Sequence, residues 1–216
     1  MKKVFCHPWS AALVIMFGVV AAVPASAADV ALLQSQWAIA TYEVDDTERA
    51  DALENLADSA RAMCDQSPGD APLLIWKGII VSSLAGEKGG LGALGLAKEA
   101  KASLEAALVL DPNAMQGSAY TSLGTLYHQV PGWPIGFGSD KKARAHLQRA
   151  LAINPDGIDS NYFMGEFMLD EREYAQSKHF LLKALAAPAR PGRKLADAGR
   201  REEAQQLLTK AEAKLD

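Results

Sequence analysis

Cysteine and histidine are both scarce in this sequence, which has two cysteines and four histidines in 216 residues. Cys6 lies in an N-terminal segment that we expect to be removed. Cys64 would then be the single remaining thiol, which excludes an intramolecular disulfide, and its Ala- and Met-rich surroundings predict a buried, unreactive side chain. His128, His146 and His179 lack the spacing of a metal site, and the phase of the last two predicts solvent-exposed positions on helices. We therefore expect no metal.

Catalytic signatures are missing too. The sequence has no Ser-His-Asp order, no nucleophile elbow and no paired carboxylates in a glycine-lined cleft. Gly90, Gly92 and Gly95 form a literal G-x-G-x-x-G, but a dinucleotide fingerprint requires a preceding strand, whereas residues 73–83 have the pattern of a helix. We therefore expect no enzymatic activity and no cofactor, and we interpret these glycines as hinges or caps in an inter-helix turn.

Positive charge is in short supply. Removing Lys2 and Lys3 with the N-terminal segment leaves 20 basic residues against 26 acidic ones, a net charge of −6. Nucleic-acid binding depends on clustered lysine and arginine that neutralise phosphates. A chain this acidic is not expected to bind nucleic acid.

The first 27 residues have the layout of a secretory signal peptide. Lys2 and Lys3 precede an apolar stretch over residues 11–23, and residues 25–27 have the small-x-small form of a cleavage site. The apolar stretch is shorter than the ~20 residues that a membrane-spanning helix needs. The sequence thus predicts a periplasmic protein without a membrane anchor after cleavage, formed by a single domain over residues 28–216.

A pattern of small and bulky residues returns in register three times. The spacings of four, three and one place these side chains on one face of a helix, and a proline follows each helix, where it belongs because it cannot continue one. The three series are Ala100, Leu104, Ala107, Leu108 and Pro112; then, 43 positions on, Ala143, Leu147, Ala150, Leu151 and Pro155; and finally Ser177, Leu181, Ala184, Leu185 and Pro188.

A second apolar helix with an internal glycine precedes each series. Gly78, Gly124 and Gly165 each cost a helix ~1 kcal/mol relative to alanine, so close approach of the neighbouring helix is the natural reason for them. Gly124 with Tyr127, followed by the second series, resembles the tetratricopeptide repeat (TPR) family. The resemblance covers about residues 70–188.

The resemblance implies an all-α, right-handed α-solenoid of helical hairpins whose concave face binds peptides or partner proteins. Compared with an ordinary repeat, the first two hairpins carry insertions of 10 and 7 residues, which predict extended inter-helix loops. The expected repeat units and the C-terminal capping helix are about 29–68, 70–112, 113–155, 157–188 and 199–215.

The second insertion contains Trp133 and Phe137 among prolines and glycines. We expect both rings to leave the solvent. They would either pack against the helices as a small separate core or form walls of an apolar pocket. In either case, Ser139 and Asp140 are expected to cap the next helix. The basic linker before the last helix offers Arg190 or Arg193 to an anionic ligand group. The candidate residues for partner or ligand binding are Tyr120, Tyr127, His128, Trp133, Phe137 and Tyr162.

These features favour a non-enzymatic periplasmic TPR scaffold that binds a protein or peptide. The chain also resembles, more distantly, the T-component family of periplasmic TRAP uptake systems. That resemblance implies a trimer around a pore that admits a small hydrophobic ligand. We therefore also keep a homo-oligomer as an alternative. The alternative hypothesis is a small-ligand-binding module that uses an aromatic pocket around the loop over residues 130–138.

Overall fold

Helices account for all of the regular structure in the computed structural model, which describes residues 25–215, and no strand occurs in that range. The predicted all-α class is confirmed. None of these helices is long and apolar enough to cross a membrane. The predicted signal peptide, residues 1–27, lies outside the described residues except for its last three. The helices are α1 (Ala25–Tyr42), α2 (Asp46–Gln66), α3 (Ala71–Lys88), α4 (Gly90–Leu110), η1 (Ala114–Gly117), α5 (Ser118–Gln129), α6 (Asp140–Ile153), α7 (Ile158–Asp170), α8 (Tyr174–Ala186) and α9 (Lys194–Glu212).

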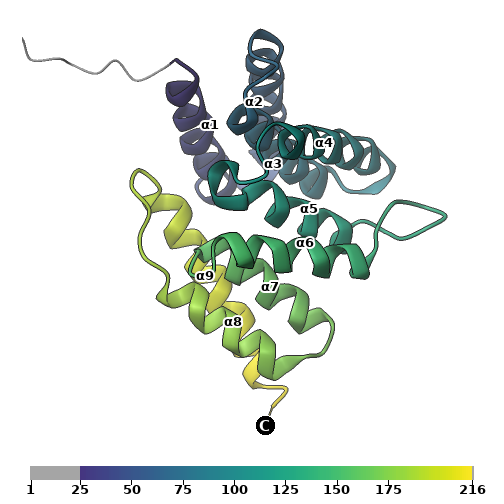
Figure 1. Cartoon of the computed structure of the whole chain (residues 1–216), viewed down its shortest axis with the longest axis vertical. Helices are drawn as coiled ribbons and strands as arrows, with labels where there is room; N and C mark the ends of the chain where they lie inside the picture. Colours follow the sequence, from purple (N-terminus) through teal and green to yellow (C-terminus); the bar gives the residue numbers. More distant parts are fainter. Residues whose placement is uncertain (1–24, 216) are drawn as a thin grey trace, which may run out of the picture.

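Consecutive helices pair into hairpins that stack into a solenoid (Figure 1). The first helices of the hairpins, α1, α3, α5 and α7, pack against one another in chain order, and the second helices lie outside them. The equivalent residues Ala107, Ala150 and Ala184 are all fully buried. The recurring small and bulky residues are therefore buried between neighbouring helices, as their spacing predicts. The α-solenoid is confirmed.

The helix-internal glycines allow the two helices of a hairpin to touch. A Cβ on Gly124 would lie 2.6 Å from Cγ of Leu147 and 3.3 Å from the carbonyl oxygen of Ala143. Gly78 meets Leu104 in the same way, and Gly165 meets Leu181. The three contacts repeat because the same two helix faces meet in each hairpin. Each glycine is thus a packing requirement and not a flexible joint.

The first insertion does not form the predicted loop. Helix α3 continues to Lys88 and α4 starts at Gly90, so Gly89 is the single residue between them. Left-handed backbone at Gly89 (φ 57°) and Gly90 (φ 61°) makes this reversal possible, since glycine adopts such angles freely. The inserted residues lengthen both helices instead. Gly92 and Gly95 lie inside α4, so the G-x-G-x-x-G motif forms no phosphate-binding loop.

Helix α9 closes the stack. It begins at Lys194 rather than near Gly199, and it packs against α8, α7 and α1. Gly199 lies against the ring of Tyr42, where an added Cβ would come within 2.3 Å of a ring carbon. The two ends of the described chain therefore meet. The last helix of the described chain thus packs against the first as well as against its neighbours in sequence.

Candidate functional site

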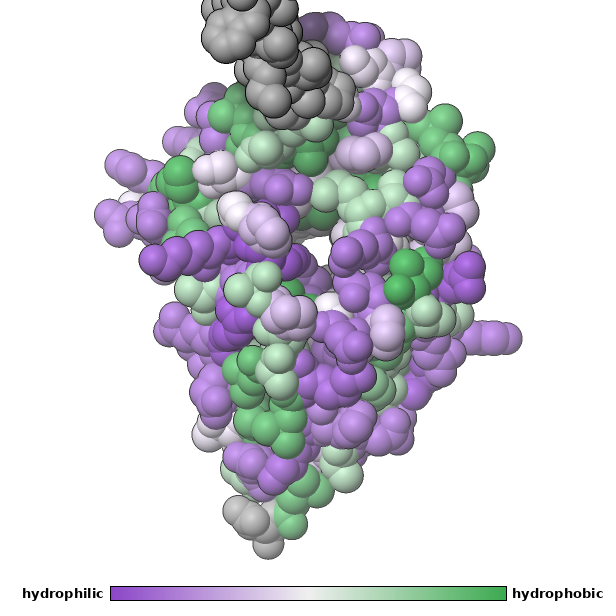
Figure 2. Space-filling view, turned by 60° about the vertical axis from the view of Figure 1, so that its left-hand side comes forward, coloured by the Kyte–Doolittle hydropathy of each residue, from purple (hydrophilic) through white to green (hydrophobic). Residues whose placement is uncertain are grey.

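A cavity of about 800 Å³ occupies the hollow between the two halves of the solenoid. Its walls come from α1, α3 and α5 on one side and from α7, α9 and the linker over residues 188–193 on the other. The space-filling view shows the surface hollowed near the centre of this face (Figure 2). The first helices of the hairpins line the cavity because they form the concave side of the stack.

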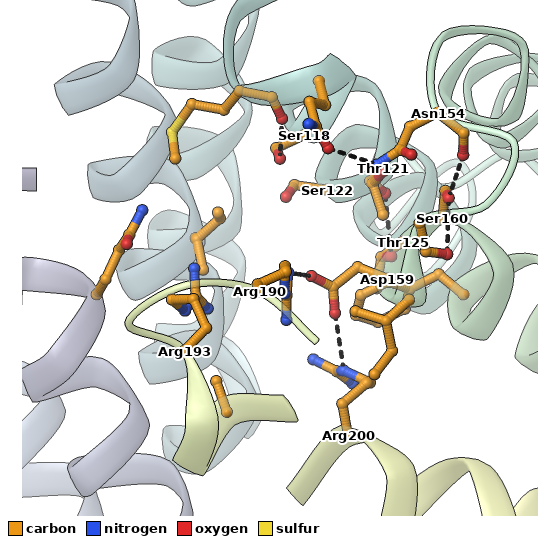
Figure 3. A pocket seen from close by; sticks show the side chains of 18 of the residues that line it. Ser118, Thr121, Ser122, Thr125, Asn154, Asp159, Ser160, Arg190, Arg193 and Arg200 are labelled. Carbon is orange, nitrogen blue, oxygen red and sulfur yellow. Dashed lines mark hydrogen bonds and ion pairs between the residues drawn. The ribbon is translucent and has the colours of Figure 1, made fainter. Parts of the chain in front are cut away.

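One wall of the cavity carries a row of hydroxyl groups on α5. Ser118, Ser122 and Thr125 are spaced by four and three residues, which places them on one face of the helix, and all three line the cavity (Figure 3). The turn before α5 sets this face. Met115 (φ 48°) and Gln116 (φ 56°) both have left-handed backbone, which is uncommon for residues other than glycine. Such strain concentrates at functional sites.

An ion-pair network fixes the opposite wall. Arg190 contacts Asp159 of α7 at 2.6 Å, and Arg200 contacts Asp159 at 3.1 Å (Figure 3). Arg190 also contacts Asp197 of α9 at 2.6 Å. Burial acts to raise the pKa of the Asp159 carboxyl, but Arg200 and Arg190 outweigh it and hold that pKa below its ordinary value. The network therefore keeps Asp159 ionised and ties the linker to α7 and α9.

Arg193 of the same linker has no ion-pair partner within residues 25–215. Its guanidinium lies over the Trp76 ring, 4.9 Å from the centroid, and its Nε is buried without a hydrogen-bond acceptor among the described residues. Burial and the nearby Arg190 lower the pKa of Arg193. The cation is held in the cavity wall by an aromatic face instead of a carboxylate.

The aromatic residues predicted to form a pocket do not line this cavity. Tyr127 and Phe137 pack edge to face at 5.5 Å, and His146 stacks on Tyr127 at 5.4 Å, with Tyr120 beside it. His146 is thus half-buried, which corrects the predicted solvent-exposed position; burial lowers its pKa. The cluster is a small core between α5, α6 and the loop that joins them.

Trp133 departs most clearly from prediction, because 90% of its surface is exposed. The base of its loop is pinned by a bond from the Gly138 amide to the Pro131 carbonyl (3.0 Å) and another from Ser139 to Tyr127 (2.7 Å). Phe137 folds inward, and the tip extends into solvent (Figure 1). The expectation that both rings leave the solvent is therefore wrong for Trp133. Ser139 does cap α6, accepting from the amide of Lys142.

The remaining two candidates lie apart from the others. Tyr162 is buried and packs its ring under the Arg200 guanidinium, 4.3 Å from the centroid, so it supports the ion-pair network. His128 bridges Asp170 (2.9 Å) and Asp140 (3.3 Å) on the outer side, where it joins the start of α6 to the end of α7. The six predicted residues do not form one site.

We expect the His128 bridge to be pH-sensitive. Burial acts to lower the pKa of His128, but the hydrogen bonds to Asp170 and Asp140 outweigh it and raise that pKa above 6.5. Its contribution to stability is therefore fully present below pH 6.5 and is lost as the pH rises through the raised folded-state value. Denaturant unfolding at about pH 6 and about pH 9 should show a decline for the wild type that His128→Gln lacks. Parallel curves for the two proteins would contradict the bridge.

The sequence indicates Arg193 as a contact for an anion, but it gives no sign that Trp76 lies beside it in the cavity wall. Trp76 has the pattern of an ordinary core residue in an apolar helix, and nothing in the local sequence brings it to a linker more than a hundred residues away. The hydroxyl row on α5 was missed as well. The spacing of Ser118, Ser122 and Thr125 is a signal that could have found it, but the apolar face of the same helix dominates the repeat pattern.

A comparison with solved structures supports the fold. TTC0263, described as a thermophilic TPR protein in Thermus thermophilus, matches with 21% identity and a TM-score of 0.54 over 87% of this chain and 90% of that one. MamA also matches, with 22% identity and a TM-score of 0.46 over 79% of this chain and 95% of that one. No curated protein matches at a significant level of sequence similarity.

A family match covers almost the whole chain. Residues 26–214 match the family described as TRAP transporter T-component. This range includes every helix from α2 to α9 and nearly all of α1. The chain therefore belongs to the TRAP transporter T-component family.

Proposed function

We propose that this chain is an exported, non-catalytic scaffold that binds another protein component of a TRAP-type uptake system in the periplasm. Membership of the T-component family and the TPR-type solenoid support an interaction role. The signal-peptide pattern over residues 1–27 supports export, and the lack of catalytic motifs in the sequence supports a non-catalytic role.

The exposed loop tip between α5 and α6 carries the proposal. Trp133 is 90% exposed and Ile135 is 67% exposed. Burying either apolar side chain would lower the free energy of the protein. The loop base is fixed by backbone hydrogen bonds and by Phe137 against Tyr127, so the tip is presented in a set conformation. An exposed tryptophan is the type of residue that dominates binding energy at protein interfaces, and the fixed loop base limits the backbone entropy that is lost on binding.

Substitution of the loop tip tests this role. We expect Trp133→Ala with Ile135→Ala to change the free energy of unfolding by less than ~0.5 kcal/mol, since both side chains face solvent. Partner capture should fall by about tenfold or more. The measurement is co-purification of the tagged full-length chain at native expression level, with the partner identified by mass spectrometry.

A matched control comes from the end of α4. Val109 is 85% exposed and lies away from the loop, so Val109→Ala should leave capture unchanged. Retention of the same partner by the loop variant would contradict the proposed surface. The recovered partner tests the assignment to the uptake system separately, because a partner unrelated to uptake would contradict that assignment alone.

Small-ligand binding is the second candidate function, and the cavity favours it. Its volume of about 800 Å³ lies within the range that ligand sites occupy. Helix α9 and its linker close one side of the concave face, which suits a small molecule better than a long peptide. The two functions use different surfaces, so the loop-tip variant should retain any ligand that the cavity holds.

A further inference from the structure

Lysine side chains surround the base of the α5–α6 loop, although the chain as a whole has a formal net charge of −4. The Nζ atom of Lys142 lies 5.1 Å from the ring centroid of Tyr127, and Nζ of Lys101 lies 5.8 Å from that of Phe137. These two rings anchor the loop, since they pack edge to face at 5.5 Å. Lys141 is exposed beside Lys142 in the first turn of α6. We call these three lysines the lysine collar, and the exposed loop tip rises from it.

The collar keeps a positive balance after the contacts within the chain are counted. Lys101 pairs with Glu105 at 2.7 Å. The carboxylate of Asp140 is contacted at 3.3 Å by the ring of a histidine in α5. Lys141 and Lys142 have no ion pair within residues 25–215. Three lysines against these two carboxylates leave the loop base positive.

Helix stability does not account for the lysines at the start of α6. The N-terminus of a helix carries partial positive charge, so its first turn favours carboxylates and disfavours cations. Asp140 follows this preference, whereas Lys141 and Lys142 oppose it. The contact with the Tyr127 ring gives Lys142 a structural role, but Lys141 has no such contact among the described residues. The position of these charges therefore points to a group outside this chain.

The loop tip and the collar lie within the footprint of one interface. Every residue from 131 to 135 is exposed, and none of them is charged. Trp133 precedes Phe137 by four residues, so their Cα atoms are at most about 14 Å apart. A standard interface covers about 800 Å² on each partner, which is a patch roughly 30 Å across. A partner that buries the tip therefore also faces the collar.

We infer that the protein partner receives the loop tip in an apolar pocket and that acidic side chains on the rim of this pocket face the lysine collar. The pocket would take Trp133 and Ile135, and the rim carboxylates would steer association and fix the orientation of the partner. This inference rests on the proposed function, because the same tip binds the partner. The hydrogen-bonded loop base favours a shaped protein pocket over a lipid surface, since a fluid bilayer does not require a preset loop.

Partner capture by the tagged full-length chain tests the acidic rim. We expect Lys141→Glu with Lys142→Glu to weaken capture about tenfold or more, because two attractive charges become repulsive. Sodium chloride should act in the same direction on the wild type. Raising it from about 0.1 M to about 1 M shortens the Debye length from about 10 Å to about 3 Å. A carbodiimide, which joins amines to carboxylates in contact with them, should couple Lys141 or Lys142 to an aspartate or glutamate of the partner.

The matched control is Lys210→Glu with Lys214→Glu. It reverses two exposed charges near the C-terminus, away from the loop (Figure 1), so capture should stay within about twofold of the wild type. Circular dichroism of both double variants confirms that they are folded.

Unchanged capture by the folded collar variant, or the absence of carbodiimide coupling to partner carboxylates, would overturn the inference. Loss of the partner by the loop-tip variant would then leave the proposed function standing. Wild-type binding to phosphatidylglycerol vesicles that the collar variant loses, with partner capture unchanged, would assign the lysines to a lipid surface and also overturn the inference. Full capture by both the collar and the loop-tip variants would contradict both proposals.

Discussion

Replacing Gly124 with valine is expected to lower the free energy of unfolding by about 3 kcal/mol, the upper end of the usual cost of overpacking a core. The first added carbon alone would lie 2.6 Å from Cγ of Leu147. Leu147 is buried under α5 and cannot move aside without opening the hairpin. Valine adds two further methyl groups to this contact. Urea unfolding followed by circular dichroism measures the effect, and Gly124→Ala provides a milder variant if the valine protein does not fold.

Gly92 in α4 provides the control. An added Cβ there would meet nothing within 4 Å, so alanine should follow helix propensity alone and stabilise the chain by up to ~1 kcal/mol. Opposite signs at the two positions would show that the glycine of the repeat is required for packing. A valine at Gly124 with wild-type stability would contradict the close approach of α5 and α6.

Replacing Asp159 with asparagine is expected to cost about 2 kcal/mol, because it removes the carboxylate that Arg190 and Arg200 share. Both arginines keep a second carboxylate, in Asp197 and Glu203, which limits the loss. Asp156→Asn is the control. That carboxylate is 81% exposed and makes only a 3.6 Å contact, so its loss should cost less than ~0.5 kcal/mol.

The effect of Asp159 should also depend on pH. Its folded-state pKa is lowered from 3.8, with burial opposing the shift and Arg200 and Arg190 outweighing it. The stabilisation is thus fully present above pH 3.8 and is lost as the pH falls through the lower folded-state pKa. The stability difference between the wild type and Asp159→Asn should stay constant near neutral pH and shrink in acid. A constant difference down to the lowest measurable pH would contradict the assigned ion pairs.

Much of the fold was predictable because the same pattern of buried residues recurs in several repeats. Ala107, Ala150 and Ala184 recur in phase, and all three prove fully buried. Gly78, Gly124 and Gly165 were equally clear as points of close helix approach, but the leucine that each of them meets became evident only from the structure. Each repeat faces the same neighbour, so one consistent pattern reports one consistent contact.

The insertions were harder to predict, because glycine and proline content alone does not distinguish a loop from a longer helix. The residues around Gly92 and Gly95 are helical because one left-handed step at Gly89 and Gly90 suffices to reverse the chain. Trp133 stays in solvent because hydrogen bonds at the loop base leave the tip beyond the reach of the helices. Both outcomes depend on the backbone geometry of two or three residues, which the amino-acid composition of a segment does not reveal.

The sequence alone determined the helical hairpins, their order and the faces on which they meet, because these follow from local periodicity repeated along the chain. Tertiary structure alone decided the cavity. Trp76 belongs to the second hairpin, the hydroxyl row to the third and Arg193 to the final linker, and they meet only because α9 returns to pack against α1. The curvature of the stack sets that return, and it is the sum of small rotations between hairpins that no single repeat encodes.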